Sequence, residues 1–219
     1  MVAIESMATL ISYSQSNDHE TLQDMVAYCA RVSNPANQHN TETNEKLIQY
    51  LIKHHHWSPF EMVSICLEIN TTRDIARQML RHRSFSFQEF SQRYAVVQDE
   101  FVPKEARLQD ATNRQHSIVT DDEVLQQAWN EKQQEVAAHS QEVYTWALNQ
   151  GIAKEQARAV LPEGMTPSRL YMNGTLRSWI HYIELRTGLD TQLEHRQIAL
   201  ACVEAITPIF PMIVRFQKI

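Results

Sequence analysis

The chain of 219 residues is long enough to bury a hydrophobic core, and its 43% hydrophobic and 21% charged content is ordinary for a globular protein. A net charge of −6 gives no overall attraction to nucleic acid or to an anionic membrane. Three cysteines without CxxC spacing indicate a reducing compartment, and the N-terminus lacks the basic segment of a signal peptide. With no long apolar run, we expect a cytoplasmic protein without a membrane span.

The glycines exclude two common ways of binding phosphate. Only four occur, and none of them forms a GxGxxG or GxxxxGK motif. A Rossmann turn and a P-loop both depend on such glycines, so neither is expected here. A phosphorylated ligand would have to be held by a local cluster of cations in an acidic chain, which makes the arginine positions informative.

The hydrophobic pattern predicts an N-terminal half of alternating strands and helices. The first predicted elements are a strand over 2–13, a helix capped by Asn17 or Asp18 that ends near Ser33, and a polar turn over 34–40. A helix over 41–53 follows, with Leu47, Leu51 and Tyr50 on its buried side. After it come a half-buried strand over 62–69, a helix from Thr71 or Thr72 to Arg83, and an extended or irregular segment over 86–97.

The C-terminal half is predicted to be mostly helical. The predicted elements are a long polar helix over 121–150, a helix over 152–160 stopped by Pro162, a strand over 166–172, and helices over 175–187 and 191–205. Together they indicate an α+β fold, in which helices cover a small, mostly antiparallel sheet and the long helices lie in the C-terminal half. We expect residues 1–219 to form a single domain.

The segment 77–94 is strongly basic for an acidic chain, with four arginines, a histidine, three serines and a glutamate. Arg77 and Arg81 lie four residues apart on the predicted helix, where their repulsion is tolerated more readily if an anion binds between them. Ser91 and Arg93, two apart on an extended chain, would point to the same side and could clamp a phosphate. The alternative is a solvated basic helix end with ion pairs to Glu61, Glu68 or Glu89.

This segment resembles the RHRxxSxxxxSxR signature of flavin-dependent thymidylate synthases. All six fixed positions are met, by Arg81, His82, Arg83, Ser86, Ser91 and Arg93. Similar matches to the family occur at HWSPFE (56–61), at ARAVLP (157–162) and across 176–194. The chain departs from the family at Met62, where a histidine is common, and at Gln88, where asparagine is common. Whether Asn173 or Thr175 takes the role of a further family asparagine stays open.

The resemblance implies an enzyme that methylates dUMP to dTMP. It implies FAD as cofactor, NADPH or NADH as reductant, and methylenetetrahydrofolate as one-carbon donor, with tetrahydrofolate as a product. It also implies a homotetramer whose active sites are shared between subunits, no metal, and no covalent nucleophile from the protein.

The family's site residues carry over to matching positions of this chain. The resemblance implies that FAD is bound by His56, Ser58, Glu61, Arg81, His82, Arg83, Ser84, Gln88, Glu89, Arg177 and His181. It implies that dUMP is bound by Gln78, Arg81, Glu89, Ser91, Gln92, Arg93, Arg158, Leu185 and Arg186. Arg186 is the expected catalytic residue, near the pyrimidine, where a cation stabilises charge that develops on the ring oxygen.

Three other interpretations start from the residues alone. A cysteine or Ser91 nucleophile would need a neighbouring base, and the thiols of Cys29, Cys66 and Cys202 are better interpreted as structural. The run 54–56 of three histidines suggests a metal site, but adjacent histidines diverge and no ligand pattern accompanies them. A non-catalytic RNA-binding module could stack bases on the aromatic residues of 81–94, although the acidic charge and the distant Arg158 and Arg186 weigh against it.

Overall fold

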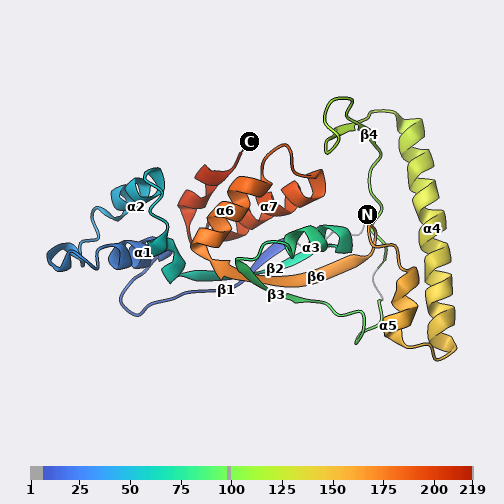
Figure 1. Cartoon of the computed structure of the whole chain (residues 1–219), viewed down its shortest axis with the longest axis horizontal. Coiled ribbons are helices and arrows are strands. Elements are labelled where there is room, and N and C mark those ends of the chain that lie inside the picture. Colours follow the sequence, from blue (N-terminus) through green and yellow to red (C-terminus); the bar gives the residue numbers. More distant parts are fainter. Residues whose placement is uncertain (1–6, 98–99, 219) are drawn as a thin grey trace.

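In the described part of the chain, residues 7–97 and 100–218 of the computed structural model, four strands form an antiparallel sheet. Figure 1 shows this sheet at the centre of an elongated molecule, between two helical ends. The strands lie side by side in the order β1 (Ala8–Tyr13), β2 (Ser64–Thr72), β6 (Pro167–Thr175) and β3 (Phe85–Glu89). Because this is not chain order, distant residues meet across the sheet, as Phe85 does with Gly174.

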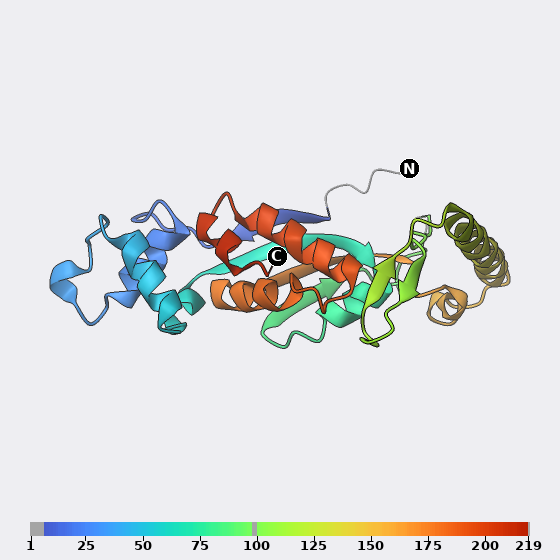
Figure 2. The same ribbon diagram turned by 90° about the horizontal axis from the view of Figure 1, so that it is seen from above.

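Two helices cover one face of the sheet. α6 (Leu176–Arg186) and α7 (Leu193–Ile206) lie together against it in both Figure 1 and Figure 2. The period-2 pattern of β2 places its alternate apolar residues in the core, and three of them are fully buried: Ile65, Leu67 and Ile69. Trp179 of α6 is also fully buried, and its indole N–H donates to the Ile65 carbonyl at 3.0 Å. The core therefore buries this polar atom with its hydrogen bond satisfied.

The remaining elements lie at the two ends of the molecule and along its edges. One end carries α1 (Leu22–Ala30), the short helix η1 (Pro35–Asn37), α2 (Asn44–Lys53) and the short helix η2 (Ser58–Met62). The other end carries a hairpin of β4 (Arg107–Gln109) and β5 (Ser117–Val119), α4 (Glu123–Asn149), α5 (Lys154–Ala157) and η3 (Arg158–Val160). The helix α3 (Arg73–Met79) joins β2 to the turn before β3, and η4 (Pro211–Phe216) follows α7.

The α+β prediction is confirmed, and α4, α6 and α7 match their predicted helices within two residues at each end. Asp122 caps α4 by accepting from the Leu125 N–H at 3.0 Å. Thr175 caps α6 in the same way, accepting from the Ser178 N–H at 3.3 Å. Among the described residues, no helix is both long and apolar enough to cross a bilayer.

Several boundaries predicted in the N-terminal half are wrong. The N-cap of α1 is Thr21, which accepts from the Asp24 N–H at 3.1 Å, and the helix ends at Ala30 instead of Ser33. Tyr50 is exposed on α2, because Ile48 and Leu51 define the buried side. The first residues of the predicted strand over 2–13, up to residue 6, lie outside the described residues.

Other differences arise from tertiary packing. The predicted helix to Arg83 ends at Met79, since His82 packs against α6 and the chain turns there. The predicted helix over 152–160 is a single short turn of α5 followed by η3. β6 continues past the predicted residue 172 to Thr175, because it pairs along its whole length with β2. The β4–β5 hairpin was not predicted, as strands of three residues carry too little pattern.

Candidate functional site

The signature residues Arg81, His82 and Arg83 occupy the turn between α3 and β3. His82 is half-buried, with its ring 5.0 Å from that of Tyr182 in an edge-on arrangement. Its Nε2 accepts from the Nε of Arg186 at 2.9 Å. Burial, and then the charges of Arg186 and Arg81, lower the pKa of His82 to about 4. The ring is therefore neutral near pH 7 and can act as an acceptor for the guanidinium.

Arg186 ends α6 and is the residue expected to be catalytic. Burial lowers the pKa of its guanidinium, which still remains charged at any physiological pH. Within the described chain, only its Nε makes a hydrogen bond, and that bond goes to His82. The other N–H groups of Arg186 are thus available to an acceptor on a ligand, and Arg81 and Arg83 add two exposed cations nearby.

Gln78, on α3, contacts residues that the sequence argument did not identify as part of the site. Its amide lies 3.2 Å from His195 Nδ1, and it donates to Gln192 at 2.7 Å. His195 is fully buried and was missed. A signal was present, because His195, Ile198, Ala199 and Cys202 repeat at helical spacing and mark the buried face of α7.

A second group of expected flavin residues lies where η2 meets α6. Arg177 donates to the Glu61 carboxylate at 2.7 Å, and the ring of His181 lies 5.0 Å from that of Trp57. Burial, and then the charge of Arg177, lower the pKa of His181. His56 and Ser58 are exposed on the chain that leads into this corner. The structure therefore brings a carboxylate, a cation and two aromatic rings together at one end of α6.

The residues expected near the dUMP phosphate follow β3. Ser91 and Arg93 were predicted to lie on an extended chain, and this is wrong: the carbonyl of Ser91 accepts from the N–H groups of Tyr94 and Ala95 at 3.1 Å, so the chain turns. The turn begins just after β3, which ends at Glu89; the Phe90 N–H still donates to the Arg169 carbonyl of β6, at 2.9 Å. Gln92 is buried, and its Nε2 has no acceptor among the described residues.

Arg93 and Arg158 approach each other through Glu155. Arg93 lies 3.7 Å from the Glu155 carboxylate, and the Nε of Arg158 donates to the Glu155 carbonyl at 3.3 Å. The Arg93 pair is largely exposed and therefore weak, so a phosphate could displace it. Thus η3 and the turn after β3 bring together two of the cations expected for dUMP.

The other expected residues have mixed surroundings. Glu89 accepts from the Ser168 hydroxyl at 2.7 Å and lies 3.3 Å from Arg73, so it already has partners within the chain. Ser84 offers its carbonyl to the Ser178 hydroxyl at 3.2 Å. Gln88 is exposed on β3, and Leu185 is exposed on α6.

Two residues outside the expected ligand sets have partners that bear on the open alternatives. Arg77 forms an ion pair with Glu163, a partner that the alternative of a solvated basic helix end did not include. Thr175 is engaged as the helix cap, whereas Asn173 is exposed on β6.

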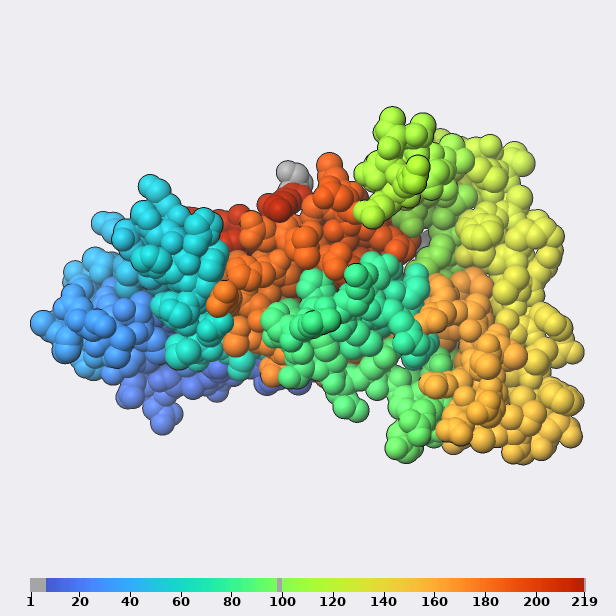
Figure 3. Space-filling model, in the orientation of Figure 1, coloured from blue at the N-terminus to red at the C-terminus, as the bar shows by residue number. Residues whose placement is uncertain are grey.

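The groups lie along the length of one surface. In Figure 3, the face toward the viewer runs from η2 through the α3–β3 segment to α5, the elements that carry the flavin corner, the basic turn and the Arg158 region. A hollow of about 370 Å³ lies beside α4, and none of the expected site residues is among those lining it.

The alternative chemistries find little support in the geometry. Burial raises the pKa of the Cys202 and Cys66 thiols, which disfavours the thiolate that a nucleophile requires. Among residues 7–97 and 100–218, no group of three or more His, Cys, Asp or Glu side chains could hold a metal ion.

Known proteins resemble this chain over most of its length. Residues 9–212 match the family described as thymidylate synthase complementing protein. A probable flavin-dependent thymidylate synthase of Paramecium bursaria Chlorella virus 1 is 52% identical over 195 residues, which are 89% of this chain and 90% of the relative. A flavin-dependent thymidylate synthase of Synechocystis sp. is 51% identical over 191 residues, 87% of either chain.

A solved structure has the same fold. A UMP/dUMP methylase from Streptomyces cacaoi, bound with 5-Br dUMP, matches with a TM-score of 0.82 and 28% identity, over 95% of this chain and 93% of that protein. The family match, the two relatives and the shared fold agree with the signature in the α3–β3 turn. The chain therefore belongs to the flavin-dependent thymidylate synthase family, whose reaction is the methylation of dUMP to dTMP.

Proposed function

We propose that the chain uses FAD as its flavin, NADPH or NADH as the reductant, and methylenetetrahydrofolate as the one-carbon donor, releasing tetrahydrofolate. The observation that carries the proposal is the pairing of Arg186 with the neutral acceptor His82 inside the signature turn. This pairing orients a partly buried guanidinium and leaves most of its donors available. A substrate whose ring oxygen gains negative charge during the reaction suits such a group.

The residues present fit a flavin dinucleotide. FAD carries two phosphates, and the turn supplies Arg81 and Arg83 without ion-pair partners among the described residues. The corner of Glu61, Arg177 and His181 offers both donors and an acceptor to the polar parts of the cofactor. We propose that these residues, with His56, Ser58, His82, Ser84, Gln88 and Glu89, hold FAD.

The protein's own contribution is binding and electrostatics. We propose that Gln78, Arg81, Glu89, Ser91, Gln92, Arg93, Arg158, Leu185 and Arg186 bind dUMP. The bound flavin supplies the reducing equivalents. Arg186 stabilises negative charge on the pyrimidine as the base is activated, and the cations beyond β3 hold the phosphate. No side chain of the protein is proposed to attack the substrate, in keeping with the raised pKa values of Cys66 and Cys202.

We also propose that the enzyme is a cytoplasmic homotetramer of single-domain subunits with active sites shared between copies. The spread of the expected ligand residues over η2, the α3–β3 turn and η3 supports assembly, because a neighbouring copy could close over them. Exposed apolar side chains on α4, among them Val124, Val136 and Trp146, offer a further surface for such packing. The large core shared by the sheet, α6 and α7 supports a single domain.

The first experiment is an absorbance spectrum of the purified protein between about 300 and 550 nm, recorded alone, with FAD, and with FAD and dUMP. We expect a bound-flavin spectrum that changes when dUMP is added, followed by dTMP formation with methylenetetrahydrofolate and NADPH. A protein that stays free of flavin in excess FAD would overturn the proposal. RNA binding with a steep salt dependence would then favour a nucleic-acid-binding module.

A further inference from the structure

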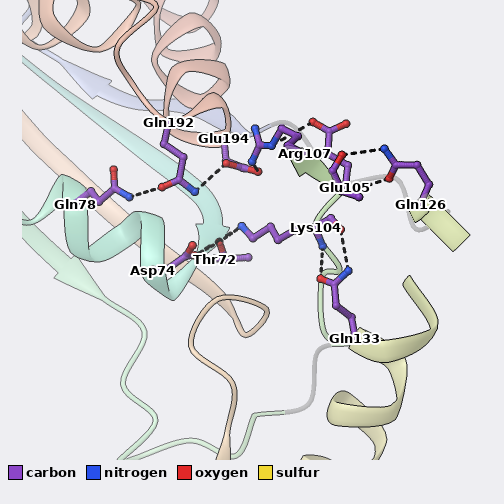
Figure 4. A network of polar contacts seen from close by, with 11 residues as sticks. Thr72, Asp74, Gln78, Lys104, Glu105, Arg107, Gln126, Gln133, Gln192 and Glu194 are labelled. Carbon is purple, nitrogen blue, oxygen red and sulfur yellow. Dashed lines mark hydrogen bonds and ion pairs between the residues drawn. The ribbon is translucent and has the colours of Figure 1, made fainter. Parts of the chain in front are cut away.

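Gln78 is held from behind by two side chains at the start of α7. Its Nε2 donates to Gln192 Oε1 at 2.7 Å, as Figure 4 shows, and its Oε1 lies 3.2 Å from the Nδ1 of His195. The Nε2 of His195 lies 3.1 Å from the hydroxyl of Tyr182. Within the described chain, these bonds leave the Gln78 amide one unused N–H and one unused lone pair.

The direction of these hydrogen bonds follows from Glu194. This side chain is paired with Arg107, and Figure 4 shows it between Gln192 and Arg107. Burial raises the pKa of the Glu194 carboxyl, but its own backbone N–H, Gln192 and Arg107 outweigh burial and lower it. An ionised carboxylate only accepts, so Gln192 must donate its Nε2 to Glu194, at 2.9 Å, and turn its Oε1 to Gln78. Gln78 must then donate to Gln192 and accept from His195.

His195 consequently carries its single proton on Nδ1. Burial, and then the charges of Arg186 and His82, lower its pKa to about 3, so the ring is neutral at physiological pH. Its Nε2 is then an acceptor for the hydroxyl of Tyr182, whose own pKa is raised by burial and which therefore keeps its proton. Each proton donated along the network from Tyr182 to Glu194 has one acceptor. Reversing the bonds of the buried His195 would leave the proton of the buried Tyr182 hydroxyl without an acceptor among the described residues.

We infer that His195 is a positioning residue for the dUMP site, because its Nδ1 proton and the Gln192 oxygen together fix which end of the Gln78 amide offers a donor and which an acceptor. The inference rests on the proposed assignment of Gln78 to dUMP. A glutamine amide keeps nearly the same shape when it flips by 180°, but the flip exchanges its N–H groups and its oxygen. Since dUMP carries both donors and acceptors, a flipped Gln78 would present the wrong group to it.

The test compares KM and kcat for dUMP in flavin-loaded enzyme. His195→Leu removes both hydrogen bonds, and we expect KM to rise about 3- to 10-fold, the effect of about one hydrogen bond, while kcat changes less than about twofold. His195→Asn should recover most of the loss, because its side-chain amide can donate from near the position of Nδ1. Should His195→Leu fail to fold, Glu194→Gln should raise KM similarly, since it lets Gln192 and Gln78 flip.

The decisive comparison uses a Gln78→Ala background. There His195→Leu should raise KM no further, because the side chain through which it acts is absent. Cys202→Ala, on the same buried face of α7, is the control for loosened packing and should leave KM unchanged.

If His195→Leu raised KM equally in the unmodified enzyme and in the Gln78→Ala background, that result would show a merely structural role and overturn the inference. An increase in KM from Cys202→Ala would do the same. An unchanged KM in His195→Leu, with a raised KM in Gln78→Ala, would overturn the inference alone. An unchanged KM in Gln78→Ala would overturn the assignment of Gln78 as well, while dTMP formation by the unmodified enzyme tests the proposed function separately.

Discussion

Arg93 and Arg186 are both expected to contact dUMP, but their surroundings differ. Arg93 is exposed and forms a weak pair with Glu155, whereas Arg186 is partly buried and held by His82. We expect Arg93→Ala to raise KM for dUMP by about 10- to 100-fold, the effect of losing a charged hydrogen bond. We expect Arg186→Ala to lower kcat by about 100- to 1,000-fold, because it removes stabilisation that develops during the reaction.

Steady-state kinetics of the flavin-loaded enzyme measures both effects. Arg215→Ala is a matched control for Arg93, because Arg215 has a similar exposure and pairs with Glu45 at 3.8 Å, outside the proposed site. It should change neither constant. Similar losses of binding in Arg93→Ala and Arg186→Ala, with unchanged turnover in both, would contradict the division of roles.

At the scale of elements, the sheet places the basic turn through one close contact between β3 and β6. A Cβ atom on Gly174 would lie 2.4 Å from a ring carbon of Phe85, and that ring packs edge-on against the buried Trp179 at 4.9 Å. We therefore expect Gly174→Ala to reduce the free energy of unfolding by about 1–3 kcal/mol through overpacking. Urea denaturation followed by tryptophan fluorescence would measure the loss.

Gly164→Ala is the control for Gly174, since a Cβ at that position would have no neighbour within 4 Å. Phe85→Leu added to Gly174→Ala should restore part of the stability, because the smaller side chain makes room. If Gly174→Ala were as stable as the unmodified protein, the close approach of β3 and β6 would not be a constraint on the sheet.

For the whole molecule, the lowered pKa values of His82 and His195 predict a loss of stability in acid. The folded pKa values of about 4 for His82 and about 3 for His195 lie below the ordinary value near 6.5. As the pH falls below about 6.5, the unfolded chain binds protons that the folded chain does not, so the free energy of unfolding decreases. The fully buried His195 contributes up to about 2 kcal/mol to the loss between pH 7.5 and 5, and the half-buried His82 contributes less because solvent screens its charge.

Denaturant titrations at pH 7.5 and pH 5 test this expectation. His195→Asn should reduce the difference between the two pH values, because one buried titrating group is gone. His139→Asn, at an exposed position of α4, is the control. A difference that His139→Asn reduces as much as His195→Asn, or no difference in the unmodified protein, would contradict it.

Much of the fold follows from local pattern. Alternating apolar residues mark β2, and apolar residues at helical spacing mark α4, α6 and α7, so their predicted bounds hold within a few residues. The signature from Arg81 to Arg93 also identified the family, because it depends on residue identity and spacing alone. Both kinds of signal are carried by neighbouring residues and do not depend on how the elements pack.

The sequence by itself therefore determined the fold class, the family and its reaction. Only the tertiary structure decided where α3 ends, that Ser91 begins a turn, and that Glu89 is already engaged by Ser168 and Arg73. It also decided that His195 contacts Gln78, 117 positions away in the chain. Such contacts could not be predicted, because each depends on how α3, α6 and α7 pack against one sheet, and that packing minimises the free energy of the whole molecule.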